Sequence, residues 1–140
     1  MGYTHYWRSN GTKFSDTSWA SICNDVKRLI AASKVPVWRE YDEPNTEPEL
    51  SNDRIRFNGT GDDGCEPLLL LRKPKDFEFC KTRFAPYDVL VCGALIIAHK
   101  HQPGVLSISS DGGPEDWKDA LALVSQTLGD GYEIPLKTND

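Results

Sequence analysis

The stretch PYDVLVCGALIIAHKH, residues 86–101, contains the longest apolar run of the sequence, from Val89 to Ala98. Proline is favoured at the first position of a helix and an acidic residue in its first turn, so Pro86 and Asp88 predict a helix start. A helix that is apolar on nearly every side packs in the middle of a domain. We therefore predict a central helix from Pro86 to about His101. A strand is the alternative, because the run is rich in β-branched residues.

Upstream of this stretch, the sequence predicts a helix with one apolar face. Ser15 suits its N-cap, and Phe14 and Trp19 have the spacing of a hydrophobic staple. Apolar residues follow at intervals of three and four, which is the helical period. Proline disfavours helix at the residue before it, so Pro36 predicts an end near Ser33.

Downstream, a third helix is predicted from Pro114 to Gly129, since proline favours helix starts and glycine favours helix ends. Its predicted inner face consists of Trp117, Leu121, Val124 and Leu128. Leu68–Leu71 is a continuous apolar run, typical of a strand buried on both faces. The segment 41–52, with two prolines, predicts an exposed loop. The other predicted strands are Tyr3–Arg8, Val37–Arg39, Arg54–Asn58, Phe77–Lys81, Val105–Ser109 and Tyr132–Ile134.

This order of elements predicts one α+β domain over residues 1–140, with a mixed or mainly antiparallel sheet packed against about three helices. The 140 residues suffice to bury a core without a disulfide or metal. The four cysteines contain no C-x-x-C pair, and the polar N-terminus has no apolar signal region. We therefore expect a cytoplasmic protein that has no membrane partner, no cofactor and no bound metal.

The formal net charge of −5 argues against a nucleic acid partner, because phosphate binding depends largely on Lys and Arg. Basic side chains do gather at Lys81-Thr82-Arg83, where a predicted strand leads into the central helix. Helix N-termini attract anions, so these three residues, with Tyr87 and Asp88 beside them, predict a site for a small anionic ligand. The alternative is a solvated strand end in which Thr82 assists a turn.

A glycine-rich loop, residues 58–64, is the second candidate part of the site. Asn58, Gly59 and Gly61 can bring backbone N–H groups close to a ligand. An early aromatic such as Trp7, or one of Tyr3, Tyr6, Trp38 and Tyr41, can stack on a base. The plainer alternatives are a hairpin loop for the glycines and core packing for the aromatics.

The sequence gives less support for a catalytic site or a metal site than for an anion site. Cys80 with a histidine and Asp88 has the residue types of a nucleophile, base and orienting acid, although nothing in the spacing shows that arrangement. His99 and His101 are two apart and face different directions, so capping of helix carbonyls is the better expectation. A magnesium site remains an alternative for the acidic residues Asp62, Asp63, Asp88, Asp111 and Asp116.

Five motifs occur in order along the chain: THYW (4–7), IRFNGTGDDG (55–64), FCKT (79–82), PYD (86–88) before the apolar helix, and SSDG (109–112) before a helix with tryptophan. This pattern resembles a group of small proteins encoded by tailed phages and prophages. The sequence departs from that pattern at Cys65, where a histidine is often expected. The resemblance implies a setting, the cytoplasm of an infected or lysogenic bacterium, and carries no catalytic residue.

From the residues and this resemblance we expect a non-enzymatic phage accessory protein that sequesters a nucleotide-like anion in counter-defence and forms a homo-oligomer. One alternative is an inhibitor that binds a host defence protein through the acidic segment 41–53. The other is a small metal- or cysteine-dependent hydrolase or nuclease.

Overall fold

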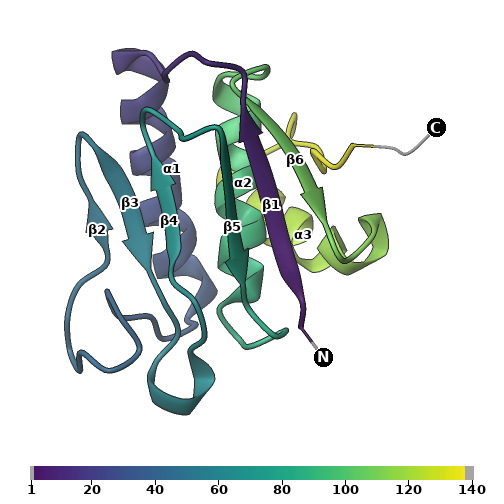
Figure 1. Cartoon of the computed structure of the whole chain (residues 1–140). Coiled ribbons are helices and arrows are strands. Elements are labelled where there is room, and N and C mark those ends of the chain that lie inside the picture. The colour runs from purple at the N-terminus through teal and green to yellow at the C-terminus, as the bar shows by residue number, and fades with distance from the viewer. Residues whose placement is uncertain (1, 138–140) are drawn as a thin grey trace.

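The computed structural model describes residues 2–137. In chain order the elements are β1 (Thr4–Ser9), α1 (Asp16–Ser33), β2 (Glu49–Leu50), β3 (Arg54–Phe57), a 3-10 turn η1 (Gly61–Asp63), β4 (Leu68–Leu71), β5 (Phe77–Lys81), α2 (Asp88–His101), β6 (Leu106–Ser110), a 3-10 turn η2 (Pro114–Trp117) and α3 (Lys118–Leu128). Figure 1 shows the strands as one layer and the three helices as a second layer behind it.

The strands form two three-stranded antiparallel sheets, with the orders β5-β1-β6 and β2-β3-β4. The predicted α+β class is thereby confirmed. β4 and β5 are consecutive in the chain, yet they belong to different sheets. A backbone bond of 3.0 Å from Glu66 N to Lys81 O joins the two sheets at the C-terminal end of β5.

The central helix is confirmed, and its all-apolar sequence is explained by what surrounds it. α2 packs against α1 and α3 and lies behind the strands, so residues 90–98 are all buried. Gly93 allows α1 and α2 to pack closely, because a Cβ at this position would lie 2.5 Å from Cδ2 of Leu29 on α1. The helix begins at Asp88, two residues after the predicted start, and a hydrogen bond from Asp88 N to Ala85 O forms the preceding turn.

The first helix follows its sequence signals closely. Ser15 caps α1 by accepting a hydrogen bond from Ser18 N, and the Phe14 and Trp19 rings pack with centroids 5.6 Å apart. Lys34 ends the helix in the left-handed conformation, with a φ of 58°. The helix therefore stops at Ser33, as predicted, before Pro36.

Several strand predictions need correction. Only Leu68 and Leu70 of β4 are buried, because helices cover a single face of its sheet; the prediction of a strand buried on both faces was wrong. The end of the predicted 41–52 loop forms β2, which pairs with β3. The segment 132–134 is not a strand, and the chain instead bridges Ile108 through Leu136.

Two short elements also differ in detail. The predicted strand at residues 37–39 is reduced to a single bridge between Trp38 and Asn58. The third helix begins as the 3-10 turn η2. Trp117 and Val124 of its predicted inner face are buried, Leu121 and Leu128 are half-buried against the core, and Ala120 is buried as well. Ala120 follows Trp117 by three residues and precedes Val124 by four, which is the spacing of one helix face.

None of the helices within residues 2–137 is long and apolar enough to cross a membrane.

Candidate functional site

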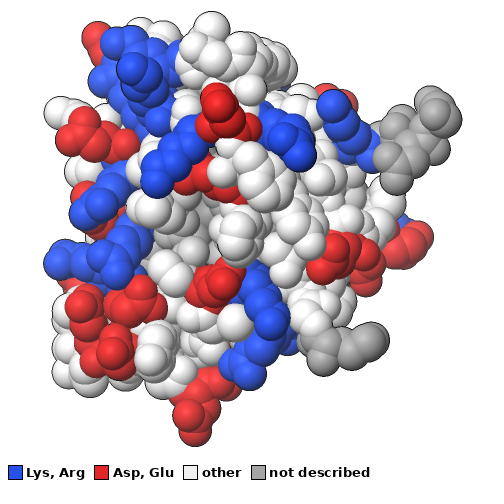
Figure 2. Space-filling model, viewed as in Figure 1, with Lys and Arg blue, Asp and Glu red and all other residues white. Residues whose placement is uncertain are grey.

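A groove of about 880 Å³ opens where β5 ends, between that strand end and the glycine-rich loop. Lys81 and Arg83 both line it, so the two basic residues that the sequence placed in an anion site share one concavity. Asp42, Asp62 and Glu66 also line the groove, which makes its charge mixed. Figure 2 shows both acidic and basic side chains on the visible face of the molecule.

The turn that carries Arg83 has an unusual backbone. Arg83 and Phe84 both have positive φ, 56° and 58°, although neither is glycine. The Arg83 Nη2 donates to Gly64 O at 2.8 Å and so ties the β5–α2 connection to the glycine-rich loop. Phe84 stacks on Tyr3, with ring centroids 3.5 Å apart. Residues in such sparsely populated backbone conformations often occur at functional sites.

Thr82 and Tyr87 do not reach the groove. The Thr82 side chain is fully buried and its Oγ1 donates to Asp88 Oδ1 at 2.5 Å. The Tyr87 ring is also fully buried, and its hydroxyl donates to the carbonyl of Glu66. Both residues were predicted as ligand contacts, and the structure gives them internal partners instead.

Asn58 is likewise an internal organiser of the glycine-rich loop. It is fully buried; its Oδ1 accepts from Gly59 N and Cys65 N, and its Nδ2 donates to Cys65 O and Glu40. Gly59 has no room for a side chain, since a Cβ there would lie 2.2 Å from a backbone oxygen. For Asn58 and Gly59, the structure therefore favours the alternative of a hairpin loop over a ligand contact.

Gly61 is the member of the predicted loop set that lines the groove, and it has a φ of 53°. Trp7 is only 1% exposed, so the prediction that its ring stacks on a ligand is wrong for this structure. Tyr41 is 47% exposed and lines the groove, which makes it the aromatic side chain that can lie against a ligand.

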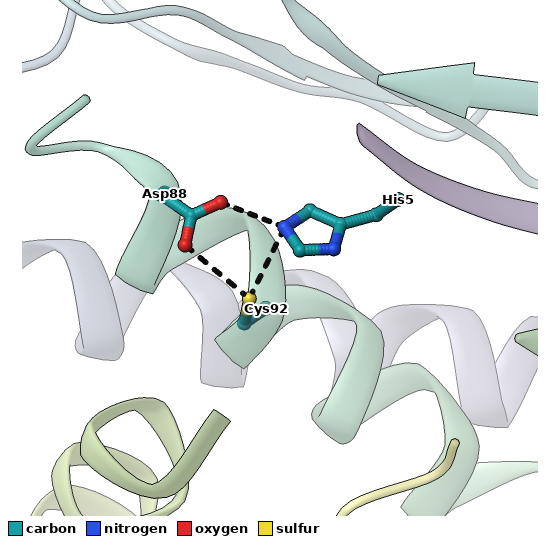
Figure 3. A group of neighbouring side chains, drawn as sticks. All are labelled: His5, Asp88 and Cys92. Carbon is teal, nitrogen blue, oxygen red and sulfur yellow. Dashed lines mark hydrogen bonds and ion pairs between the residues drawn. The ribbon is translucent and has the colours of Figure 1, made fainter. Parts of the chain in front are cut away.

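A second group of polar side chains lies beneath β1, at the start of α2 (Figure 3). His5 Nε2 lies 2.7 Å from Asp88 Oδ1 and 3.4 Å from Cys92 Sγ, and Cys92 Sγ lies 3.7 Å from Asp88 Oδ2. His5 and Cys92 are buried, and 13% of the Asp88 side chain is exposed. On its other side, His5 Nδ1 lies 2.8 Å from Ser110 Oγ.

This group does not have the arrangement of a nucleophilic triad. One nitrogen of His5 faces both the thiol and the carboxylate, whereas a triad uses the two nitrogens separately. Burial and the neighbouring Asp88 charge raise the pKa of Cys92 well above its ordinary value, which disfavours a free thiolate nucleophile. Cys80, which the sequence suggested as nucleophile, is buried on β5 opposite His5 in the strand register, and its thiol faces the carbonyl of Glu66.

His99, His101 and Asp111 have structural partners. His99 lies 3.2 Å from Glu133 and His101 lies 2.6 Å from Asp25, so carboxylates rather than helix carbonyls engage the two rings. Asp111 accepts from Thr4 N at 3.0 Å and from the Tyr6 hydroxyl at 3.1 Å.

Sequence reasoning named Asp88 but missed its partners His5 and Cys92. The spacing of Asp88 and Cys92, four residues apart on a predicted helix, was an available signal, because such residues share one face. His5 gave no comparable signal, since it reaches the group only through the pairing of β1 with β5 and β6.

The chain matches no protein-family model, no curated protein and no solved structure in the three comparisons made.

Proposed function

We propose that the protein binds a small nucleotide-like anion in the groove at the end of β5, without transforming it. The observation that carries this proposal is the convergence of Lys81, Arg83 and the exposed ring of Tyr41 on one concavity of about 880 Å³. A volume of this order suits a small-molecule ligand.

The mixed charge of the groove matches the mixed chemistry of a nucleotide. Lys81 and Arg83 supply donors for phosphate oxygens, and charge-assisted hydrogen bonds of this type are the stronger ones. Asp42, Asp62 and Glu66 supply acceptors for sugar hydroxyls or a base amino group. Tyr41 supplies a ring for stacking against the base. A simple inorganic anion would use only the donors of Lys81 and Arg83.

The biological setting in this proposal is counter-defence by a phage or prophage. It rests on the five ordered motifs that resemble phage-encoded proteins, together with the capacity of the groove for a nucleotide signal. A protein that sequesters such a signal needs tight binding and no turnover.

The test is calorimetric titration with cyclic dinucleotides and ADP-ribose, using wild type, Lys81→Gln and Arg83→Gln. Loss of a charged hydrogen bond costs about 1.5–3 kcal/mol, so each substitution should weaken binding about tenfold or more. Lys73→Gln and Lys75→Gln are matched controls, because both lysines are exposed on the turn at the other end of β5. Ligand recovered chemically unchanged after denaturation supports sequestration. Absence of binding by every probe to the folded protein refutes the proposal.

A second candidate, self-association, is favoured by an exposed aromatic stripe on the β5-β1-β6 sheet. Phe77 and Phe79 are 42% and 54% exposed, and Tyr6 stacks on Phe77 with centroids 6.1 Å apart. The alternative interface with a host protein, the acidic segment 41–53, is partly neutralised by a 2.9 Å ion pair between Glu49 and Arg54.

Light scattering tests this second candidate. Self-association through the stripe predicts an oligomer that Phe79→Ser converts to monomer and that Phe84→Ser, a similarly exposed phenylalanine outside the stripe, leaves intact. A wild-type monomer at high concentration contradicts it.

A further inference from the structure

The group His5, Asp88 and Cys92 contains three of the side-chain types that bind zinc in proteins. Asp88 and Cys92 lie one turn apart on α2, and His5 faces them from β1 (Figure 3). One ligand atom from each lies within 4.8 Å of the other two. Within residues 2–137, these three residues are the cluster of this kind that the structure brings together.

The two distances from Cys92 Sγ to its neighbours suit a single ion. Zinc bonds of about 2.0–2.3 Å at tetrahedral angles place pairs of ligand atoms about 3.3–3.8 Å apart. Cys92 Sγ lies 3.4 Å from His5 Nε2 and 3.7 Å from Asp88 Oδ2, inside this range. The His5 Nε2 to Asp88 Oδ1 contact of 2.7 Å is a hydrogen bond, and a bound ion would replace it.

Neighbouring residues hold two of the three side chains in the required orientation. Ser110 Oγ lies 2.8 Å from His5 Nδ1, the nitrogen that points away from the cluster, and Ser110 Oγ also accepts from Gly112 N. Metal-binding histidines usually donate their second N–H to such a partner. Thr82 donates to Asp88 Oδ1 and leaves Oδ2 on the side of Cys92.

The cluster is also accessible from outside. A cavity of about 260 Å³ has Asp88 and Cys92 in its wall, and the exposed Asp116 and Asp119 lie in the same lining. A cation can reach the thiol and the carboxylate through this cavity. Three protein ligands with an open side are typical of zinc sites that keep one position for water or another ligand.

We propose that His5 Nε2, Cys92 Sγ and Asp88 Oδ2 bind one Zn²⁺ ion, with the fourth position facing the cavity beside Asp116. On binding, the Cys92 thiol becomes a zinc thiolate and its proton passes to solvent. His5 binds through unprotonated Nε2 and donates from Nδ1 to Ser110. This site is separate from the groove, and its proposal does not depend on nucleotide binding.

The first measurement is the zinc content of protein purified without added metal or chelator. About one zinc per chain is expected for wild type, and a content near zero for Cys92→Ser. Cys80→Ser is the matched control, because Cys80 is also a buried cysteine but lies outside the cluster. Its zinc content should equal that of wild type.

The second measurement is titration of metal-free, folded protein with Co²⁺, followed by competition with Zn²⁺. We expect a thiolate-to-cobalt charge-transfer band that is absent in Cys92→Ser and lost when Zn²⁺ is added. Ser110→Ala should retain the band but bind about tenfold more weakly, since loss of a partner to a metal-binding histidine weakens affinity by about 10–100-fold. Circular dichroism verifies that each variant is folded. A wild type that is folded, yet shows neither zinc nor the cobalt band, overturns the proposal, as does a band that persists in Cys92→Ser.

Discussion

Asn58 shows how one buried amide can organise a loop. Its side chain forms hydrogen bonds with Gly59 N, Cys65 N and Cys65 O. Because the side chain is fully buried, water does not replace these hydrogen bonds when the amide is removed. Each buried polar group left without a partner costs about 1–3 kcal/mol.

We therefore expect Asn58→Ala to lower the free energy of unfolding by about 3 kcal/mol, measured by urea denaturation. Asn52→Ala, at an exposed position, should change it by less than about 0.5 kcal/mol. Equal effects of the two substitutions would show that the loop does not depend on the amide.

Glu40 gives a prediction about pH. Burial raises the pKa of Glu40, but hydrogen bonds from Tyr41 N, Asn58 and Arg56 together outweigh burial and hold that pKa below its ordinary value. A carboxylate whose folded pKa is lowered stabilises the fold above its unfolded pKa of about 4.3, and this contribution disappears as pH falls through the folded pKa.

Accordingly, the free energy of unfolding of Glu40→Gln should lie below that of wild type above about pH 5, with the gap closing as the pH falls through the folded pKa of Glu40. Denaturant titrations across this range provide the measurement. Glu43→Gln is the matched control, because Glu43 is exposed. A gap between wild type and Glu40→Gln that does not vary with pH would contradict the assignment.

At the level of single residues, the sequence predicted part of the candidate site. Lys81 and Arg83 were found because basic residues at a strand end stay accessible. Thr82 and Trp7 were misassigned because their burial depends on elements distant in the chain, which sequence periodicity does not reveal. The contact of His5 with Asp88 joins positions 83 residues apart and depends on the pairing of β1 and on the packing of α2 against the strands.

Among the elements, α2 illustrates a conflict between helix propensity and packing. Gly93→Ala should gain about 1 kcal/mol in helix propensity. The new methyl would lie 2.5 Å from Leu29, which is fully buried, and overpacking of a core costs about 1–3 kcal/mol.

Packing should prevail, so we expect Gly93→Ala to destabilise the protein by about 1 kcal/mol in thermal or urea unfolding. Gly113→Ala is the control, because Gly113 has an ordinary φ of −104° and open space where a Cβ would stand. A Gly93→Ala variant more stable than wild type would mean that Leu29 moves aside freely.

The elements themselves were predictable where one local pattern dominates. The Ser15 cap and the Phe14–Trp19 contact defined α1, and the apolar run defined α2. The sequence did not predict two sheets or the pairing of β2, since those depend on which strand edges meet. The apolar run of β4 was misleading, because Leu69 and Leu71 remain half-buried on the uncovered face.

For the whole molecule, the connection from β5 to α2 joins the two proposed sites. Lys81 at the end of β5 and Arg83 in the connection line the groove, whereas Thr82 and Asp88 belong to the polar group around His5. The two consecutive positive φ angles at Arg83 and Phe84 let this short segment turn from one site to the other. Both proposals can therefore be tested on one protein with separate variants.

The most direct test of the central claim is a titration of isotope-labelled protein with ADP-ribose, and then with cyclic dinucleotides, followed by amide chemical shifts. Binding in the groove predicts that the largest shifts fall on Gly61, Gly64, Cys65, Lys81 and Arg83, the residues around its wall. Shifts centred on the Phe77 and Phe79 face, or no saturable shift with any probe, would contradict it.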